Sequence, residues 1–229
     1  MSTESPTPAV QQPKSTSLIL TLGIIAMLAG FFVVLTVQLT APRIALNEQR
    51  ALEKAVFAVL PEASSSKNFL LDETGLHPLA KEDIGQANVF AGYTAEGDLA
   101  GVAMEGDARG YQDVVKVLYG YAIDSGCVIG MTVLQSTETP GLGDKVSSDP
   151  DFLANFDCLE ARLNEDGTAM AHEIVTVKNG NKTQPWQIDG ISGATVTSMA
   201  IGTALRESTN EMLPLLMKYK EALLPGMQP

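Results

Sequence analysis

Histidine is scarce in this sequence, and the two that occur, His77 and His172, lie neither in a spacing typical of metal ligands nor beside an obvious nucleophile. Their scarcity argues against a zinc site and against serine–histidine–aspartate catalysis. Runs of lysine or arginine are absent too, and 27 acidic against 15 basic residues give a formal net charge of −12. Nucleic acid is therefore a poor candidate for a partner.

Cysteine is equally rare. Cys127 and Cys158 belong to no Cys-x-x-Cys motif and to no haem-attachment motif. The simplest interpretations are two buried thiols or one disulfide, and the sequence does not choose between them.

A charge-free apolar run occupies residues 18–37. About 20 such residues span a bilayer as a helix. We therefore predict a transmembrane helix over residues 18–40, after a disordered polar tail over residues 1–17. A cleaved signal peptide is the alternative, but the run exceeds the usual apolar core of one, and Pro42 disfavours cleavage after Ala41. The sequence favours a retained anchor.

Beyond the anchor, apolar residues recur at helical spacing over residues 42–60, and Pro61 should stop that helix. A loop-rich stretch to residue 86 completes a helix and connecting segment over residues 41–85. The remaining pattern predicts an α+β fold, with one domain over residues 86–213 that holds a mainly antiparallel sheet and packed helices. Three hairpins are expected, 89–93 with 99–104, 114–123 with 128–135, and 173–178 with 186–188.

Two helices are predicted to pack on this sheet. One covers residues 151–156, and the other covers residues 196–212 with Ile201, Leu205 and Met212 on one face. Pro214 should end or kink the second helix, which leaves a C-terminal tail over residues 214–229.

Small and hydroxyl residues crowd together just before that second helix, in Asp189-Gly190-Ile191-Ser192-Gly193-Ala194-Thr195-Val196-Thr197-Ser198. Glycine lets the backbone approach a ligand, hydroxyls donate to phosphate oxygens, and the start of a helix favours an anion. A bare Ser-Gly-Ala-Thr is more simply a loop that caps a helix. The longer pattern Asp-x-x-Ser-Gly-Ala-Thr resembles the signature at which a flavin transferase attaches FMN to threonine through a phosphodiester, and the acceptor is then Thr195.

A second motif, Glu138-Thr139-Pro140-Gly141-Leu142-Gly143-Asp144-Lys145, lies about fifty residues upstream. Pro-Gly predicts a type II turn, and Gly143 frees the next amide to face a ligand. It is no dinucleotide fingerprint, because position 146 is valine where the third glycine should stand. On composition alone it is an ordinary turn.

Together, the two motifs resemble the FMN-binding domain found in the G subunit of the Rnf ion-translocating electron-transport complex. The resemblance covers most of the chain, including Gln38-Leu39-Thr40, Leu60-Pro61 and Gly110-Tyr111. The C subunit of the Na⁺-translocating NADH:quinone reductase shares both motifs. The Gly-Asp-Lys ending and the compact length fit the Rnf G subunit better.

The resemblance implies a covalent FMN between the motifs, bonded to Thr195. Its phosphate would be steadied by Ser192, Gly193, Ala194 and Thr197, and its ring system and ribityl chain would lie along Glu138, Thr139, Leu142, Gly143 and Lys145. Lys145 either stabilises the reduced flavin or is a solvated lysine, and Tyr111 is either a pocket residue or a rim residue. Asp189 and Gly190 would be recognised by the external flavin transferase. No metal site and no catalytic residue are expected.

The resemblance further implies a redox subunit that relays electrons through FMN while the whole complex couples ferredoxin/NAD-linked transport to movement of Na⁺ or H⁺. Partners would be the other integral-membrane and iron–sulfur subunits. The expected location is the bacterial inner membrane, in a single pass, with residues 1–17 cytoplasmic and the FMN domain on the outer face. The alternatives are an FMN carrier that stands alone or is similar to the C subunit of the quinone reductase, and an anchored binding module without cofactor.

Overall fold

The computed structural model describes residues Ser15–Leu224, and these form two compact units. The first unit ends at Glu48 and the second begins at Gln49. Most of the tail predicted for residues 1–17 lies outside the described residues, and Ser15–Ser17 belong to a helix.

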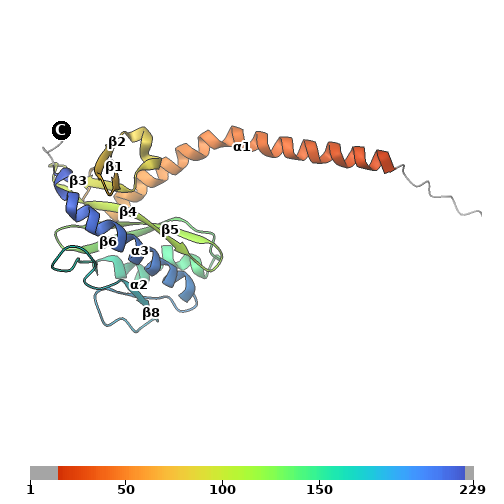
Figure 1. The fold of residues 1–229 in the computed structure, drawn as a ribbon. Helices are drawn as coiled ribbons and strands as arrows, with labels where there is room; N and C mark the ends of the chain where they lie inside the picture. Colours follow the sequence, from red (N-terminus) through yellow and green to blue (C-terminus); the bar gives the residue numbers. More distant parts are fainter. Residues whose placement is uncertain (1–14, 225–229) are drawn as a thin grey trace, which may run out of the picture. The chain divides into compact units, whose positions relative to one another are not determined.

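A single helix, α1 (Ser15–Val59), replaces the two helices expected on either side of residue 41 (Figure 1). Pro42 lies inside α1, although proline removes a backbone donor and usually breaks a helix at a cost of about 3 kcal/mol. The apolar part of α1 is exposed and has a hydropathy of 2.8, which is long and apolar enough to cross a membrane. The helix ends two residues before Pro61, as predicted.

The second unit is built on a seven-stranded sheet in which every neighbouring pair is antiparallel. In space, the order is β2-β1-β3-β4-β5-β6-β7. The strands are β1 (Ser65–Asp72), β2 (Gly75–Leu79), β3 (Val89–Tyr93), β4 (Leu99–Arg109), β5 (Val114–Ala122), β6 (Cys127–Gln135) and β7 (Leu159–Glu160). The α+β prediction is confirmed, and so are the first two hairpins, β3–β4 and β5–β6.

The loop-rich interpretation of residues 64–86 is wrong. This stretch contributes β1 and β2 to the sheet edge and the short 3₁₀ helix η1 (Lys81–Gln86). Phe69 and Leu71 of β1 are buried in the core, although the serines at the start of the strand carry no apolar signal. Pairing with β3 and burial against the core therefore decide the structure of this segment.

The third predicted hairpin is also wrong. β8 (Val175–Val177) and β9 (Gln187–Asp189) do pair, but they run parallel. The turn at Asn179-Gly180 exists, because the Asn181 amide donates to the Lys178 carbonyl. After that turn the chain travels back through residues 181–186 before it enters β9, so the two strands point the same way.

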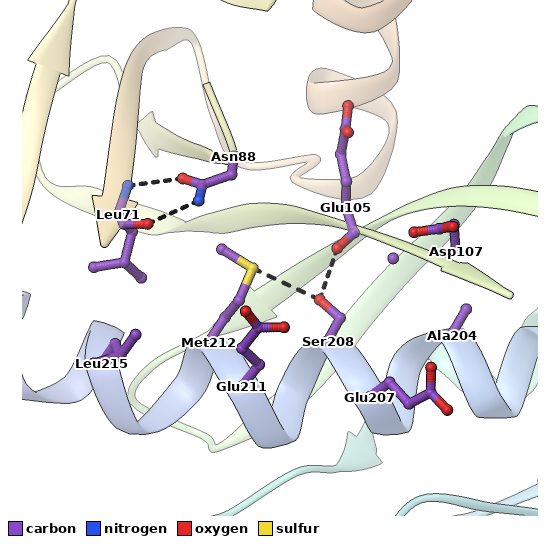
Figure 2. Close-up of a pocket in the computed structure, with 11 residues that line it drawn as sticks. Leu71, Asn88, Glu105, Asp107, Ala204, Glu207, Ser208, Glu211, Met212 and Leu215 are labelled. Carbon is purple, nitrogen blue, oxygen red and sulfur yellow. Dashed lines mark hydrogen bonds between the residues drawn. The ribbon is translucent and has the colours of Figure 1, made fainter. Parts of the chain in front are cut away.

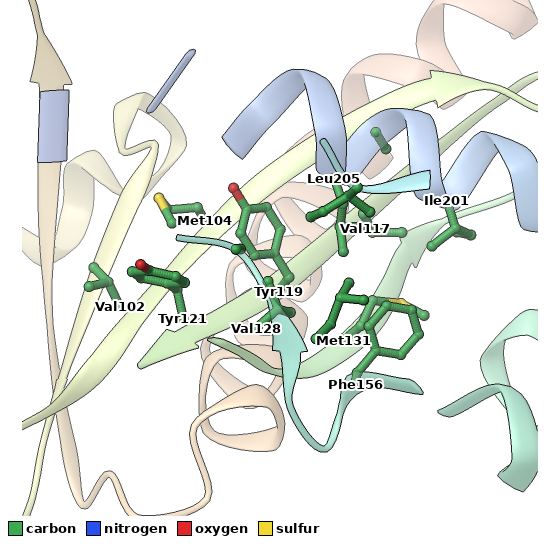
Figure 3. Close-up of a cluster of buried hydrophobic side chains, with 14 of the residues drawn as sticks. Val102, Met104, Val117, Tyr119, Tyr121, Val128, Met131, Phe156, Ile201 and Leu205 are labelled. Carbon is green, nitrogen blue, oxygen red and sulfur yellow. The ribbon is translucent and has the colours of Figure 1, made fainter. Parts of the chain in front are cut away.

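Helix α3 (Thr195–Tyr219) runs across one face of the sheet (Figure 1), and Ile201 and Leu205 are fully buried there. Figure 3 shows these two side chains over Val117 and Tyr119 of β5. The opposite face holds a smaller cluster, in which Val56, Val59 and Leu60 of the chain before the sheet pack with one buried residue each from β3, β4 and β5: Phe90, Ala103 and Leu118. Four short helices complete the unit, α2 (Pro150–Leu153), η2 (Gly143–Ser147), η3 (Ala154–Phe156) and η4 (Lys220–Leu223).

Pro214 does not end α3, which continues to Tyr219. The residues beyond the proline are held by the core: Leu216 is fully buried, and Leu223 is 1% exposed. The Tyr219 hydroxyl also donates to the Glu73 carbonyl at 2.9 Å. These contacts offset the hydrogen bond that the proline cannot make.

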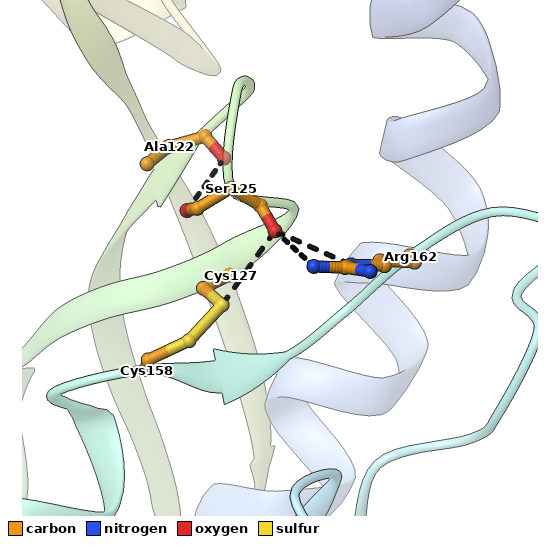
Figure 4. Close-up of a disulfide and its surroundings, with 5 residues drawn as sticks. All are labelled: Ala122, Ser125, Cys127, Cys158 and Arg162. Atoms are coloured by element: carbon orange, nitrogen blue, oxygen red, sulfur yellow. Dashed lines mark hydrogen bonds between the residues drawn. A yellow bond between two sulfur atoms is a disulfide. The ribbon is translucent and has the colours of Figure 1, made fainter.

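Cys127 and Cys158 form a disulfide, which settles the alternative that the sequence left open. It ties the start of β6 to the residue just before β7, at an edge of the sheet (Figure 4). Arg162 closes the same corner, because its Nη2 donates to the Ser125 carbonyl at 3.0 Å.

Candidate functional site

Both sequence motifs meet at one pocket of about 430 Å³. Its walls come from the loop after β4, the loop after β6 and the start of α3. The lining residues are Tyr111, Glu138, Thr139, Leu142, Gly143, Gly193, Ala194, Thr195, Val196 and Thr197. The volume lies within the roughly 300–1,000 Å³ of small-molecule sites.

Thr195 is the first residue of α3, and its side chain is exposed at the pocket. No side chain caps this helix start in the described part of the chain. The first amides of a helix have no partner within the helix, and they carry the positive end of its dipole. A phosphate bonded to Thr195 would lie in front of them.

Ser198 holds the motif loop in shape from inside. Its buried hydroxyl accepts from the Ile191 amide and donates to the Ala194 carbonyl, both at 3.0 Å. This side chain, which the sequence offered as a phosphate donor, is thus occupied within the loop. Ser192 is exposed in the same loop but does not line the pocket.

Asp189 and Gly190 lie behind the pocket rather than in it. The Asp189 carboxylate accepts from the Gly180 amide at 2.8 and 3.0 Å, and its backbone amide donates to Asn155 at 2.9 Å. The Gly190 amide donates to the Val177 carbonyl at 3.0 Å. These bonds join β9 to its surroundings and set the point from which the motif loop begins.

The turn after β6 has the predicted geometry. The Leu142 amide donates to the Thr139 carbonyl at 3.1 Å across Pro140 and Gly141, and Gly141 has φ +78°, as the third position of a type II turn requires. Leu142 is consequently presented at the pocket with half of its surface exposed. Tyr111, 72% exposed, belongs to another wall.

Glu138 is the buried centre of the site, at 7% exposure. One carboxylate oxygen accepts from the Gln112 amide at 3.0 Å, and the other accepts from the Thr197 hydroxyl at 2.5 Å. Burial by itself raises the pKa of this carboxyl, but hydrogen bonds from Thr197 and from the amides of residues 111–113 outweigh it and hold the pKa below its usual value. Glu138 is therefore ionised at neutral pH.

Two glycines make room for this carboxylate. A Cβ on Gly110 would lie 2.6 Å from Glu138 Oε1, and one on Gly143 would lie 2.7 Å from Oε2 and 2.8 Å from Thr197 Oγ1. Real Cβ atoms do not come so close, so a larger residue at either position would displace the Glu138 carboxylate. The sequence explained Gly143 by a free amide, whereas the structure shows a packing reason.

Of the residues expected around the flavin, Ser192 and Lys145 do not line the pocket. Lys145 is an exposed residue of η2. Val196, 50% exposed, lines the pocket and was not predicted, although it directly follows Thr195 in the sequence.

A second pocket, of about 220 Å³, lies between α3 and the strands β1 and β4 (Figure 2). Four carboxylates line it, from Glu105, Asp107, Glu207 and Glu211. Such a lining repels a phosphate. The pocket at Thr195 fits FMN better, since it combines an uncapped helix start, an exposed hydroxyl and the apolar side chains of Tyr111, Leu142 and Val196.

The fold and this site define an FMN-binding domain, and the family model described as "FMN-binding domain" matches residues 110–210. The chain is 33% identical over 194 residues to the G subunit of the ion-translocating oxidoreductase complex of Vibrio vulnificus, with 82% of this chain and 85% of the relative covered. It is 26% identical over 197 residues to the protein of the same name from Methanosarcina acetivorans, with coverage of 85% and 93%. The chain belongs to the family of G subunits of the ion-translocating oxidoreductase complex.

A solved structure agrees on the fold. The crystal structure of the C subunit of Na⁺-translocating NADH-quinone reductase from Parabacteroides distasonis matches with a TM-score of 0.55 at 19% identity. The match covers 81% of this chain and 98% of that one.

Proposed function

We propose that this chain is the membrane-anchored flavoprotein subunit of an ion-translocating oxidoreductase complex, and that it relays electrons through an FMN joined to Thr195 by a phosphodiester. The observation that carries the proposal is the position of Thr195. Its exposed hydroxyl lies at the uncapped start of a 25-residue helix, in the pocket where both motifs meet.

Attachment needs an external flavin transferase, because a threonine hydroxyl is protonated at neutral pH and the carboxylate that lines the described pocket, Glu138, already accepts from Thr197 and from the Gln112 amide. The oxygen of Thr195 would bond to the phosphorus of the FMN half of FAD, the bond between the two phosphates would break, AMP would leave, and the hydroxyl proton would pass to a base of the transferase. Exposure of Thr195 supports access by such an enzyme.

The bound flavin supplies reversible acceptance and release of electrons, and the protein orients it. Tyr111, Leu142 and Val196 offer exposed apolar surface at the pocket for an isoalloxazine ring. Asp189 and Gly190 hold the base of the motif loop, and the transferase would read the shape that they give it.

The partners would be the integral-membrane and iron–sulfur subunits of the complex, which couples ferredoxin/NAD-linked electron flow to Na⁺ or H⁺ movement. The apolar part of α1 would anchor the chain in the inner membrane with its N-terminus inside. The disulfide supports an outer position for the domain, because disulfides persist in oxidising compartments and are rare in the cytosol.

The test uses the full-length chain, exported and co-expressed with a flavin transferase, and compares wild type with Thr195→Ala. Thr203→Ala is the matched control, since Thr203 is a half-buried threonine on the same helix. Intact mass and in-gel flavin fluorescence should show one FMN on wild type and on Thr203→Ala, and none on Thr195→Ala. A bare wild-type chain beside an active transferase would refute the proposal and favour an anchored module without cofactor.

A further inference from the structure

The contact between Glu138 and Thr197 lies two residues from the proposed attachment point. We propose that Glu138 is a positioning residue. Its carboxylate accepts a hydrogen bond from the Thr197 hydroxyl and thereby fixes the first turn of α3 so that Thr195 faces the pocket. This inference rests on the proposed function. It changes the role expected for Thr197, from a phosphate donor to the partner of a buried acid.

The proton count supports this change of role. A threonine hydroxyl has one proton to donate. In Thr197 that proton goes to Glu138 Oε2 at 2.5 Å, within a contact that is buried on both sides. The hydroxyl has no second proton for a phosphate oxygen. An ionised carboxylate is also a strong acceptor, since hydrogen bonds to charged groups exceed neutral ones in strength.

Because of helix geometry, the hydrogen bond between Thr197 and Glu138 also fixes the direction of the Thr195 side chain. At 3.6 residues per turn, side chains two positions apart point in directions about 200° apart. Thr197 is 1% exposed and points inward to Glu138, so Thr195 must point outward, and it is exposed. A first turn freed from Glu138 could rotate or fray, and the hydroxyl of Thr195 would lose its fixed direction.

The same carboxylate reaches the opposite wall of the pocket. Its other oxygen accepts from the Gln112 amide at 3.0 Å, next to Tyr111. Glu138 thus joins segments that are 26 and 59 residues away from it in the sequence. Removing one donor leaves the buried carboxylate with fewer hydrogen bonds. The desolvation penalty of that charge exceeds the net stability that the lost hydrogen bond contributed.

The experiment uses the full-length chain with a flavin transferase and follows FMN attachment over time by intact mass. The variants are Glu138→Gln, Thr197→Val and Thr197→Ser, and Thr203→Val is the matched control on the same helix. We expect a drop of roughly tenfold or more in attachment rate for Thr197→Val, a clear drop for Glu138→Gln, and near wild-type rates for Thr197→Ser and Thr203→Val.

Glu138→Gln separates the two roles of Thr197. The Gln112 amide needs an acceptor, so the glutamine oxygen would face it, and the glutamine NH2 would then donate to the Thr197 hydroxyl and release the threonine proton for a phosphate. If Thr197 were a phosphate donor, Glu138→Gln would therefore attach FMN at the wild-type rate or faster. That result overturns the proposal, as does wild-type attachment in Thr197→Val.

A second measurement needs no flavin. Amide hydrogen exchange on the apo full-length chain should show faster exchange over residues 111–113 and 195–199 in Glu138→Gln and Thr197→Val, and an unchanged pattern in Thr203→Val. Unchanged exchange in both segments would also overturn the proposal. Because this measurement is independent of FMN, a wild type that stays bare refutes the flavoprotein function and leaves the positioning role to be decided by exchange.

Discussion

Removing the disulfide should lower the stability of the domain that follows the anchor strongly. Cys127 and Cys158 enclose a loop whose ends are 31 residues apart, and that loop carries β6, Glu138, the type II turn and α2. In the chain-entropy view, cross-linking a loop of this length stabilises the folded state by about 3.7 kcal/mol. For a domain of this size each kcal/mol shifts the melting temperature by about 2–4 °C, so the expected loss is about 7–15 °C.

The edge of the sheet offers little to compensate. β7 pairs with β6 through two residue pairs only, Cys127 with Glu160 and Val128 with Leu159. Other ties at this corner are the Ala161 amide to the Gly126 carbonyl at 2.9 Å, the Glu160 amide to the Pro185 carbonyl at 3.0 Å and the Arg162 contact. Loosening this edge should also slow FMN attachment, because Glu138 lies within the enclosed loop.

The assay is thermal unfolding of the full-length chain in detergent, for wild type and for the double variant Cys127→Ser/Cys158→Ser, with and without reductant. Reductant should lower the melting temperature of wild type to that of the variant and leave the variant unchanged. Equal melting temperatures for all samples would refute the stabilisation argument. Free thiols found by alkylation in freshly isolated membranes would remove the support for an outer position.

Two further predictions concern the buried acid and its glycines. The pKa of Glu138 is below that of an unfolded glutamate, so its contribution to stability is present above about pH 4.3 and is lost as the pH falls through the lowered native pKa. The melting temperatures of wild type and Glu138→Gln should therefore converge on acidification. A constant difference between them would contradict this prediction. Gly143→Ala forces a Cβ against Glu138 and Thr197 and should cost about 1–3 kcal/mol with faster amide exchange at the start of α3. Gly193 is the control, because it has φ +86° and open space around its Cβ position: Gly193→Ala should cost about 1–2 kcal/mol of backbone strain without faster amide exchange at the start of α3. Equal amide exchange in the two variants would count against the packing explanation.

Local signals predicted the parts of the fold that local interactions decide. The hairpins β3–β4 and β5–β6 have turn residues between two apolar strands, and both were confirmed. The Asn179-Gly180 turn was predicted correctly as well, yet the hairpin built on it was wrong. Strand direction there depends on contacts from distant segments, such as the Pro185 carbonyl with the Glu160 amide at 3.0 Å.

Proline and serine led to wrong predictions of helix ends and of a loop, because tertiary contacts override their local preferences. Pro42 and Pro214 have strong local preferences, and both lie inside continuous helices. For α3 the explanation is the burial of Leu213 and Leu216 around the proline, which outweighs a local cost of about 3 kcal/mol. β1 begins with serines, which are typical of loops, and its buried apolar residues, Phe69 and Leu71, come only later in the strand.

For the site, the residues of the two motifs were identified from sequence, but their division of labour was not. No local pattern indicates that Thr197 donates to Glu138, 59 residues away, or that the Ser198 hydroxyl is used up in hydrogen bonds within its own loop. Both facts concern which donor meets which acceptor in the folded chain. A sequence motif identifies the polar side chains of a site, and only the tertiary structure shows which of their donors and acceptors remain available for a ligand.

The lining of the pocket gives a physical reason for the proposed covalent tether. No lysine or arginine is among the lining residues of the described pocket, and Lys145 lies outside it. A free FMN phosphate would have neutral hydroxyls and the uncapped amides of α3 to hold it, and a helix dipole contributes about 0.3–1 kcal/mol to such an anion. The ionised Glu138 nearby would oppose the phosphate charge. The proposed phosphodiester to Thr195 would remove the need for strong electrostatic binding, and it would leave the buried acid free to order the walls of the site.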